Sequence, residues 1–426
     1  MSGKSETGAL AEWRRHGRVV APCVAGIMLV SAHGHALGVM IHPLEEAFGW
    51  PRAQISAGFM IISIMALFLG PVVGRAVDRW GPRRIALAGL PLYCTTLAML
   101  SLAGASILTW WALWALLALG ALTILPVVWL AVLNRYFDAS RGLAMAVALS
   151  GTGIGAAIFP YLTNTLVEHF GWRHAYVALA AICFVVVFPL TWALLRDAPR
   201  EQRRPGALHD EPVPPMPTAA PGAREQMRSL RFAKLAAASA IFSVASCALT
   251  NNMVPVLLGE GLAPATAAAT AGLLGIGSII GRLAGGFLLD RLDANKVAAV
   301  SVMLPVLPAS ILLASDHSQG WSALACLLMG LSVGTELDAC GYLAARHFGT
   351  RNFGVLFGSI NGLLLFGAGL APLTANYAYD VTKSYDVVLV ALIPLFALTA
   401  LLFLSLGSYR DRDPVTGMER KAFAAH

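Results

Sequence analysis

The amino-acid sequence predicts an all-α membrane protein in which twelve transmembrane helices form two pseudo-symmetric six-helix bundles. Three observations lead to this prediction: apolar segments recur along the whole chain, positive charges are concentrated in alternate loops, and the two halves of the chain repeat one another. Only 12% of the 426 residues are charged, whereas soluble domains carry roughly 25%. This composition excludes an ordinary soluble enzyme.

The apolar segments are long enough to cross a bilayer as helices. About 20 apolar residues span a ~30 Å hydrocarbon core, and the segments are continuous blocks rather than the short alternating runs of a membrane barrel. Because lipid offers the backbone no hydrogen-bond partners, helices satisfy their own peptide groups. We predict spans at residues 19–40, 55–77, 85–105, 110–133, 143–167, 175–195, 232–258, 267–289, 297–314, 322–344, 355–377 and 387–406.

The distribution of Lys and Arg predicts the orientation of these spans. Of the 30 Lys and Arg residues, 26 lie in or beside the termini and the loops on one side. Only Arg52, Arg173 and Lys383 lie on the other side, and Arg282 lies within a span. Since cytoplasmic loops are enriched in positive charge, both termini are predicted to be cytoplasmic. The net charge of +7 therefore reflects membrane topology and not a nucleic-acid partner.

The second half of the chain repeats the first at a nearly constant offset. Equivalent residues are 212 positions apart at three places and 211 apart at a fourth. The pairs are Pro43 and Pro255, Asp78 and Asp290, Arg79 and Arg291, Pro160 and Pro372, Arg135 and Arg346, and Phe137 and Phe348. Such a repeat indicates a duplicated six-helix unit, with a substrate site near the midplane between the halves.

The repeat divides the chain into three parts. Residues 1–195 form the first six-helix half, and residues 232–426 form the second half with a short cytoplasmic tail. Residues 196–231 contain seven prolines and charges of both signs, a composition that cannot bury a core and is typical of a flexible cytoplasmic linker. A regulatory docking segment is the alternative interpretation of this stretch.

A charged loop after the second span resembles the signature loop of the major facilitator superfamily. It reads Gly74-Arg-Ala-Val-Asp78-Arg79-Trp-Gly81-Pro-Arg83-Arg84, and a degenerate copy ending in Asp290-Arg291 follows the eighth span. The resemblance covers the whole chain and implies a transporter. We interpret Gly74, Asp78, Arg79, Arg83, Asp290 and Arg291 as a cytoplasmic gate.

Other segments are similar to the branch of monocarboxylate porters and oxalate–formate antiporters. The similar strings are Asn134-Arg-Tyr-Phe137, Ser150-Gly-Thr-Gly153-Ile-Gly155, Phe170-Gly-Trp-Arg173 and Glu336-Leu-Asp338. Arg282 occupies the position of the branch's substrate-binding arginine. His35 aligns with a lysine of the animal porters, and Ser278 stands where those proteins carry an aspartate. The resemblance implies a bacterial inner-membrane protein that transports an organic carboxylate.

Arg282 is the strongest candidate for substrate binding on chemical grounds as well. An arginine at membrane depth costs at least ~2.5 kcal/mol and normally faces a cavity or a partner. Its guanidinium stays charged and can bind a carboxylate through two hydrogen bonds. The equivalent residue of the first half is Gly70, so the charge does not belong to the shared scaffold. The alternative role is a salt bridge to Glu336 or Asp338.

Glu336 and Asp338 are acidic residues well inside the tenth span. Their counterparts in the first half are Leu125 and Val127. Two positions apart on a helix, the two side chains point in different directions. A carboxylate in such a place can bind and release a proton during transport. Proton coupling and an internal ion pair remain open for Glu336, whereas an ion pair is the favoured role of Asp338.

Several uncharged polar residues complete the candidate site. His35 in the first span is a candidate proton site because histidine titrates near neutrality. Asn251 and Asn252 lie late in the seventh span, just before Pro255. They could bind an anion or satisfy carbonyl groups that the proline leaves free. Asn361 in the eleventh span is a weaker candidate of the same kind.

The sequence shows no feature that requires a cofactor or a metal. The six cysteines lie in apolar segments without a CxxC pattern, and Gly151-Thr-Gly153-Ile-Gly155 lies inside a span, where it favours helix packing over nucleotide binding. We therefore predict a transporter, not an enzyme, that functions as a monomer in the lipid bilayer. Its expected partners are a small anionic substrate and protons. The alternatives are a proton-driven exporter of larger apolar compounds and a carboxylate–carboxylate antiporter.

Overall fold

The structure is a computed structural model, and it describes residues 11–137, 140–195, 223–314, 318–348 and 353–407. Within these ranges every regular element is a helix. Of the predicted linker, residues 196–222 lie outside the described part, and Ala223–Met227 forms the short helix α9. The side chains of Asp78 and Asp290 also lie outside the description.

The first half of the chain contains six crossings. Helices α2 and α3 together make the first, α4 the second, α5 the third, and α6 with α7 the fourth. Their bounds are Val20–Val30 for α2, Ala32–Phe48 for α3, Arg52–Trp80 for α4, Pro82–Met99 for α5, Ile107–Leu122 for α6 and Pro126–Tyr136 for α7, with single 3₁₀ turns at Gly17–Val19 and Leu100–Leu102.

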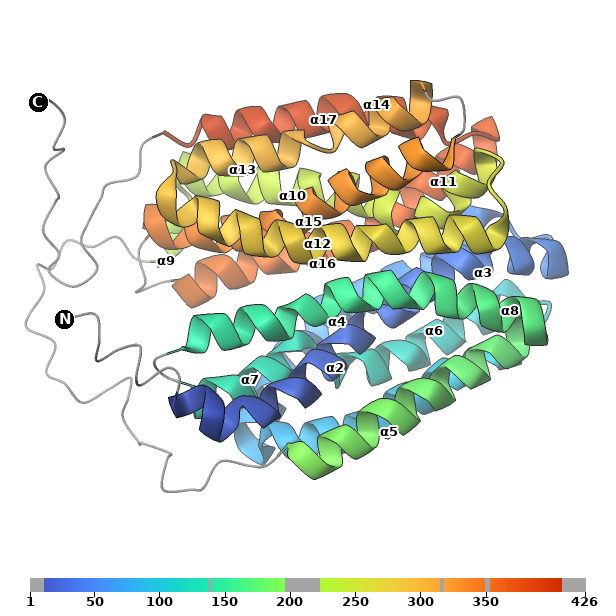
Figure 1. Cartoon of the computed structure of the whole chain (residues 1–426), viewed down its shortest axis with the longest axis horizontal. Helices are drawn as coiled ribbons and strands as arrows, with labels where there is room; N and C mark the ends of the chain where they lie inside the picture. Colours follow the sequence, from blue (N-terminus) through green and yellow to red (C-terminus); the bar gives the residue numbers. More distant parts are fainter. Residues whose placement is uncertain (1–10, 138–139, 196–222, 315–317, 349–352, 408–426) are drawn as a thin grey trace, which may run out of the picture.

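The fifth and sixth crossings are merged into one long helix, α8, Arg141–Leu194. At 1.5 Å per residue its 54 residues would extend about 80 Å, far more than a ~30 Å hydrocarbon core. The chain instead reverses at Gly171, which has φ 73° and ψ 163°, a conformation open to glycine. Figure 1 shows α8 folding back on itself near its label. The eleven candidate spans of the described residues therefore contain twelve crossings, which confirms the predicted fold.

The second half follows the same plan. Helices α10 and α11 make the seventh crossing, α12 the eighth, α13 with α14 the ninth, and α15, α16 and α17 the last three. Their bounds are Leu230–Thr250 for α10, Met253–Gly259 for α11, Pro264–Arg291 for α12, Ala294–Met303 for α13, Val306–Ala314 for α14, Gln319–Phe348 for α15, Phe353–Thr382 for α16 and Asp386–Leu404 for α17.

The seventh crossing is interrupted for a local reason. Pro255 has no N–H to donate to the carbonyl of Asn251, and its ring crowds that carbonyl. Helix α10 accordingly ends at Thr250, and α11 begins at Met253. The interruption leaves Asn251 and Asn252 between two helices, where their side chains are free to point in different directions.

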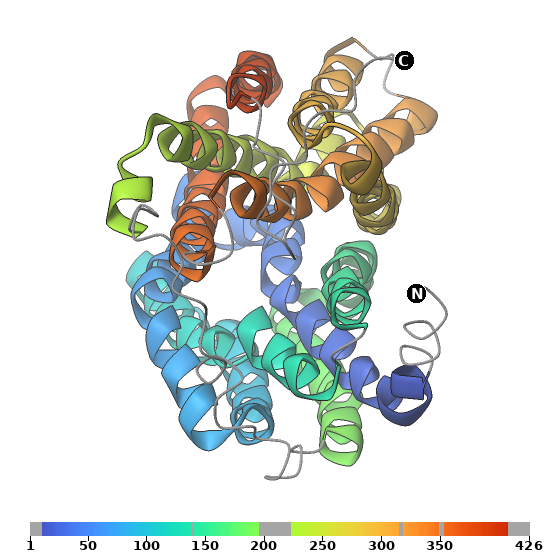
Figure 2. The same ribbon diagram turned by 90° about the vertical axis from the view of Figure 1, so that its left-hand side faces the viewer.

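Buried apolar side chains gather into two separate clusters. One is built from residues 19–195 around Trp110 and Trp114. The other is built from residues 232–406 around Phe242 and Phe396, and includes one residue of the first half, Val39. Figure 1 shows the corresponding two groups of helices, blue to green and yellow to red. Figure 2, viewed from the end where the termini lie, shows the same two groups one above the other.

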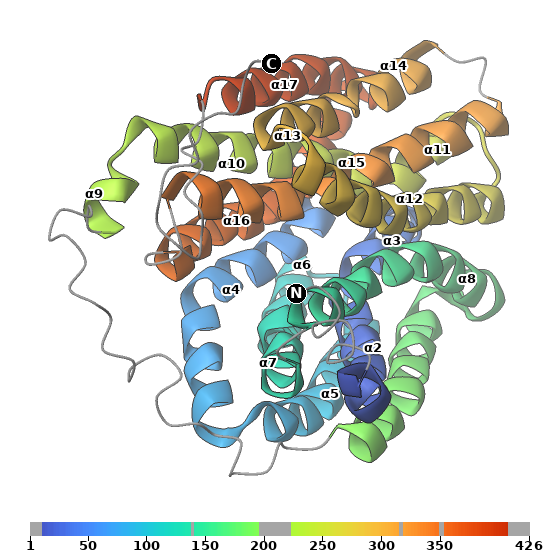
Figure 3. The same cartoon turned by 60° about the vertical axis from the view of Figure 1, so that its left-hand side comes forward.

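Among the described residues, the main contacts between the two groups are those of α4 with α16, α8 with α12, and α3 with α11. Figure 3 shows α16 next to α4 and α12 next to α8. The contact of α8 with α12 depends on glycine, because a methyl group at Gly275 would overlap the carbonyl oxygen of Gly153. In Figure 1 the two groups meet near α3, α8 and α11 and separate toward the end where the termini lie.

Candidate functional site

A cavity of about 140 Å³ lies between the two halves. Five helical crossings contribute to its wall, and most of the contributed side chains are small or polar. The lining residues are Ser31, His35, Thr152, Gly153, Ala156, Thr250, Asn251, Leu274, Ser278, Gly330 and Val333. The location matches the prediction of a site between the halves. Six of these residues carry hydrogen-bonding side chains, and the other five are apolar or glycine.

Arg282 lies one helical turn beyond the cavity. It follows Ser278 by four residues on α12, about 6 Å along the axis, and its side chain is only 7% exposed. Its Nη1 lies 3.3 Å from Oδ1 of Asp338 on α15. The structure thus brings Arg282 and Asp338 together in the ion pair that the sequence left open as an alternative.

Glu336 takes a different direction from Asp338. It is buried, and its Oε1 accepts a hydrogen bond from the thiol of Cys340, with a sulfur–oxygen distance of 3.1 Å. The sulfur of Cys340 in turn lies 3.0 Å from the hydroxyl of Ser239 on α10. Glu336 therefore belongs to a polar group inside the second half and does not line the cavity.

His35 lines the cavity, whereas the two neighbouring histidines do not. Nδ1 of His33 lies 3.3 Å from the hydroxyl of Tyr93 inside the first half. His42 is exposed and pairs with Glu46 at 3.4 Å. Within the described part of the chain, no group of three or more His, Cys, Asp or Glu side chains is arranged to hold a metal ion.

The three candidate asparagines have three different environments. Asn251 lines the cavity. Asn252 is fully buried: its Nδ2 donates to the carbonyl of Ala248 at 2.8 Å, and its Oδ1 accepts a hydrogen bond from Asn376 at 2.8 Å. Asn361 is exposed on α16 and is not part of the cavity wall.

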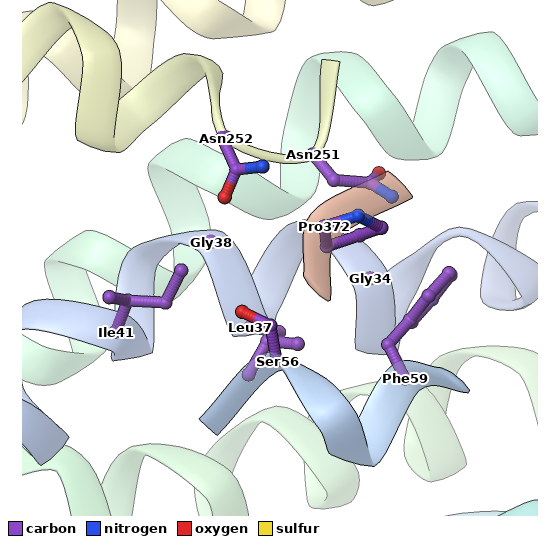
Figure 4. A pocket seen from close by; sticks show the side chains of 9 residues that line it. All are labelled: Gly34, Leu37, Gly38, Ile41, Ser56, Phe59, Asn251, Asn252 and Pro372. Carbon is purple, nitrogen blue, oxygen red and sulfur yellow. The ribbon is translucent and has the colours of Figure 1, made fainter. Parts of the chain in front are cut away.

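A closed contact, which we call the seam, seals the cavity on the side of the Gly171 reversal. It is formed by α3, α4, the α10–α11 break and α16, and the space left there is too small for a water-sized sphere. Its lining residues are Gly34, Leu37, Gly38, Ile41, Ser56, Phe59, Asn251, Asn252 and Pro372. Figure 4 shows Asn251 and Asn252 facing the stretch of α3 that carries Gly34 and Gly38.

Polar contacts between the halves hold the seam. Nδ2 of Asn376 on α16 donates to the hydroxyl of Ser56 on α4 at 2.7 Å. The hydroxyl of Tyr385 donates to Oδ1 of Asn376 at 2.7 Å. Tyr385 lies between the last two spans, and burial raises its pKa above the ordinary value, so its hydroxyl keeps the proton that it donates.

Arg52 and Asp380 extend this network to the surface. The Asp380 carboxylate accepts hydrogen bonds from the backbone N–H groups of Arg52 and Ala53, at 3.0 and 2.8 Å, so α16 caps the first turn of α4. The Arg52 guanidinium pairs with Glu45 at 3.0 Å and lies 3.8 Å from the centre of the Tyr379 ring. Sequence reasoning missed the seam, because no local pattern links residues more than 300 positions apart.

The predicted gate residues lie at the opposite end of the molecule. Nε of Arg83 donates to the carbonyl of Leu195, at the end of α8, at 2.5 Å. Arg291 lies over the ring of Phe287 at 4.0 Å, Arg79 is exposed and Gly74 is half-buried. The described contacts of Arg83 and Arg291 stay within the half to which each belongs. Their role as a gate remains a prediction.

The Major Facilitator Superfamily model matches residues 23–372, which is most of the chain. The chain belongs to the Major Facilitator Superfamily. It is therefore a membrane transporter, as predicted, and not an enzyme. Membership also explains the duplicated six-helix plan and the two loops that repeat across the halves.

Relatives of known name include carboxylate transporters. Monocarboxylate transporter 13 of Bos taurus is 28% identical over 358 residues, covering 82% of this chain and 79% of the relative. The gallate transporter of Pseudomonas putida is 27% identical over 380 residues, covering 78% and 82%. Monocarboxylate transporter 12 of Mus musculus is 23% identical over 391 residues, covering 86% and 80%.

Solved structures share the fold at low identity. The nucleoside transporter NupG superposes with a TM-score of 0.69 at 13% identity, over 92% of this chain and all of NupG. A bacterial homologue of the human lysosomal transporter Spinster, in an inward-facing and unoccupied conformation, gives a TM-score of 0.68 at 16% identity, over 92% of this chain and 98% of that one. At these identities the likeness concerns the fold alone.

Proposed function

We propose that this protein is a secondary transporter that moves a small monocarboxylate across the bacterial inner membrane by alternating access. The observation that carries the proposal is the position of Arg282. It is a buried cation of the second half that has no counterpart in the first, and it lies one turn from the cavity between the halves. A guanidinium in that position favours an anionic ligand of carboxylate geometry.

The ion pair with Asp338 fits this role. In the empty protein Asp338 supplies the negative charge that a buried guanidinium requires. A substrate carboxylate competes for the same guanidinium from the side of the cavity. Because Asp338 is 30% exposed while Arg282 is 7% exposed, the aspartate can give up the contact at lower cost. The relatives that transport monocarboxylates and gallate agree with an anionic substrate.

The proposal assigns the structure to one stage of transport. With both termini in the cytoplasm, as the Lys and Arg distribution indicates, the seam closes the outer side of the cavity. The molecule then stands in an inward-facing state, in which the gate loops are apart. A proton is the proposed coupling ion, with His35 and Glu336 as candidate carriers, and the monomer is the proposed functional unit.

Uptake measurements on the Arg282→Gln variant test the proposed function. Glutamine keeps much of the length and loses the charge. A hydrogen bond to a charged group contributes about 1.5–3 kcal/mol, so uptake of a radiolabelled carboxylate at low concentration should fall about 10- to 150-fold. The variant must elute from size exclusion like the parent protein. Unchanged uptake by such a variant contradicts the proposal.

A further inference from the structure

Helices α12 and α15 pack against each other backbone to backbone. A methyl group at Gly277 or Gly281 of α12 would overlap a carbonyl oxygen of α15. A methyl group at Gly330 or Gly334 of α15 would likewise overlap a carbonyl oxygen of α12. Small residues let membrane helices approach this closely, so the side chains that follow on the two helices meet at short range.

The ion pair of Arg282 and Asp338 lies one turn beyond this contact. The carbonyl oxygen that Gly334 faces belongs to Ser278. Arg282 follows Ser278 by four residues and Asp338 follows Gly334 by four, which is about 6 Å along each helix. The register in which the glycines set α15 on α12 therefore decides which side chain faces Arg282. A shift of one turn would take Asp338 away from it.

Thr335 is buried in this contact and fills the space between two glycines of α12. Its hydroxyl lies 2.9 Å from the carbonyl oxygen of Gly281 on α12 and 3.0 Å from that of Leu331 on its own helix. The carbonyl of Gly281 forms one peptide group with the N–H of Arg282. A methyl group at Gly285 would overlap Cγ2 of Thr335. The side chain thus lies against the turn that carries Arg282 and blocks sliding of α15 along α12.

The internal repeat of the sequence indicates that this contact is not part of the shared scaffold. In the first half, larger residues stand in place of the glycines of α12, and an isoleucine stands in place of Thr335. The equivalent residues are Met65, Leu69 and Val73 for Gly277, Gly281 and Gly285, and Ile124 for Thr335. The glycines and the hydroxyl accompany the half that carries Arg282 and Asp338, which favours a role connected with this pair.

Building on the proposed function, we infer that Thr335 is a positioning residue that fixes where Arg282 presents its guanidinium to the substrate carboxylate. Thr335 does not line the cavity, so it acts through Arg282 and not by touching the ligand. A guanidinium binds a carboxylate best through two parallel N–H···O bonds. Such a group must be held within about 0.5 Å of its productive position by the residues around it. The hydrogen bond to Gly281 and the contact with Gly285 hold the backbone of Arg282 in this way.

Uptake kinetics of Thr335→Val test the inference in proteoliposomes that contain the full-length protein. Valine keeps the shape of threonine and loses the hydroxyl. The probes are radiolabelled lactate, pyruvate and benzoate. The half-saturating concentration should rise about 3- to 20-fold, the range that one hydrogen bond between membrane helices can supply, while the maximal rate stays unchanged. Thr335→Ser, which keeps the hydroxyl, should restore the parent value.

Thr399→Val is the matched control. Thr399 is buried in α17, and its hydroxyl donates to the carbonyl of Leu395 on its own helix at 2.8 Å. Loss of this hydroxyl removes the same group from a buried helix position away from Arg282. It should leave the half-saturating concentration unchanged.

A double variant separates a positioning role from a general structural one. If Thr335 acts through Arg282, adding Thr335→Val to Arg282→Gln should cause no further fall in uptake at low substrate concentration. A structural role that is independent of Arg282 predicts that the two losses multiply, as they do for uncoupled sites.

The outcomes separate this inference from the proposed function. A Thr335→Val variant with the parent half-saturating concentration overturns the inference and leaves the carboxylate site intact, and so does a further 3- to 20-fold fall in the double variant. If Thr335→Val does not fold, Thr335→Cys replaces it, because a thiol is a weak donor, and the same rise is expected. Parent-like uptake by Arg282→Gln, or a parent protein that transports none of the acids, overturns the proposed function and this inference with it.

Discussion

The guanidinium of Arg282 and the carboxylate of Asp338 face each other across the contact between α12 and α15, with 3.3 Å between Nη1 and Oδ1. The pair joins the helix that borders the cavity to the helix that also carries Glu336. Its two members differ in exposure, and the more exposed member is the one that a substrate carboxylate would replace.

The Asp338→Asn variant should be less stable when empty and should bind carboxylate more tightly. Removing the partner leaves a buried guanidinium uncompensated, which costs several kcal/mol in a fully buried pair. Because Asp338 is 30% exposed, we expect a loss of about 1–2 kcal/mol and a lower Tm. An added carboxylate should restore the lost charge, so its stabilising effect on Tm should exceed that on the parent protein. A variant with unchanged Tm and unchanged carboxylate affinity contradicts this role for Asp338.

The Asp380→Asn variant should open the seam. Both carboxylate oxygens of Asp380 accept backbone N–H groups. Asparagine replaces one of these oxygens by an NH2 group, which cannot accept, and a buried donor left without its partner costs about 1–3 kcal/mol. A change of 1–2 kcal/mol alters the ratio of two states by a factor of about 5–30. A cysteine introduced at Leu37, which is buried in the seam, should then react faster with a membrane-impermeant thiol reagent in a background without native cysteines.

Asp386→Asn is the matched control for this experiment. It removes the same charge from a nearby exposed position at the start of α17 and should leave the labelling rate at Leu37→Cys unchanged. Equal rates in the parent protein, Asp380→Asn and Asp386→Asn would show that the cap does not hold the seam.

The Gly38→Ala variant should prevent full closure of the seam by crowding alone. Its methyl group would lie 2.6 Å from the carbonyl oxygen of Asn251, and neither backbone can move without separating α3 from α11. We expect slow uptake together with faster labelling at Leu37→Cys. Gly320→Ala at the start of α15, where the added methyl group meets open space, should leave transport intact, since alanine favours a helix over glycine by roughly 0.5–1 kcal/mol.

The helices could be predicted from the sequence because membrane insertion imposes local rules. An apolar run identifies α4 or α17 without reference to any other part of the chain, and Gly171 lies in the short gap predicted between the fifth and sixth spans. The contacts of the Glu336 and Asp338 side chains were harder to predict from the sequence. Helix geometry separates the two side chains, and Cys340, the partner of Glu336, follows it by four residues on the same helix. Arg282, the partner of Asp338, and Ser239, the partner of Cys340, depend on how α15 packs against α12 and α10.

The seam could not be predicted at all. Arg52 entered the sequence argument only as a loop charge, and Asp380 and Asn376 had no evident role. Their contacts join the start of α4 to the end of α16, and such pairing arises from the docking of two complete halves. The repeat predicts that the halves meet, but a repeat of scaffold residues carries no information about the polar groups that differ between them.

Glu336→Gln separates proton-driven transport from simple exchange of carboxylates. Glutamine preserves the shape and the oxygen that accepts the hydrogen bond from Cys340, but it cannot bind and release a proton. In proteoliposomes, accumulation of labelled carboxylate driven by an imposed pH gradient should fall at least about tenfold. Exchange of labelled for unlabelled carboxylate at equal pH should continue, because Arg282, Asn251 and the cavity are unchanged.

Gradient-driven accumulation that survives in Glu336→Gln assigns the proton to His35, in which case His35→Gln must abolish it. If accumulation survives in both variants, neither residue carries the proton, and if the parent protein shows exchange alone, it is a carboxylate–carboxylate antiporter.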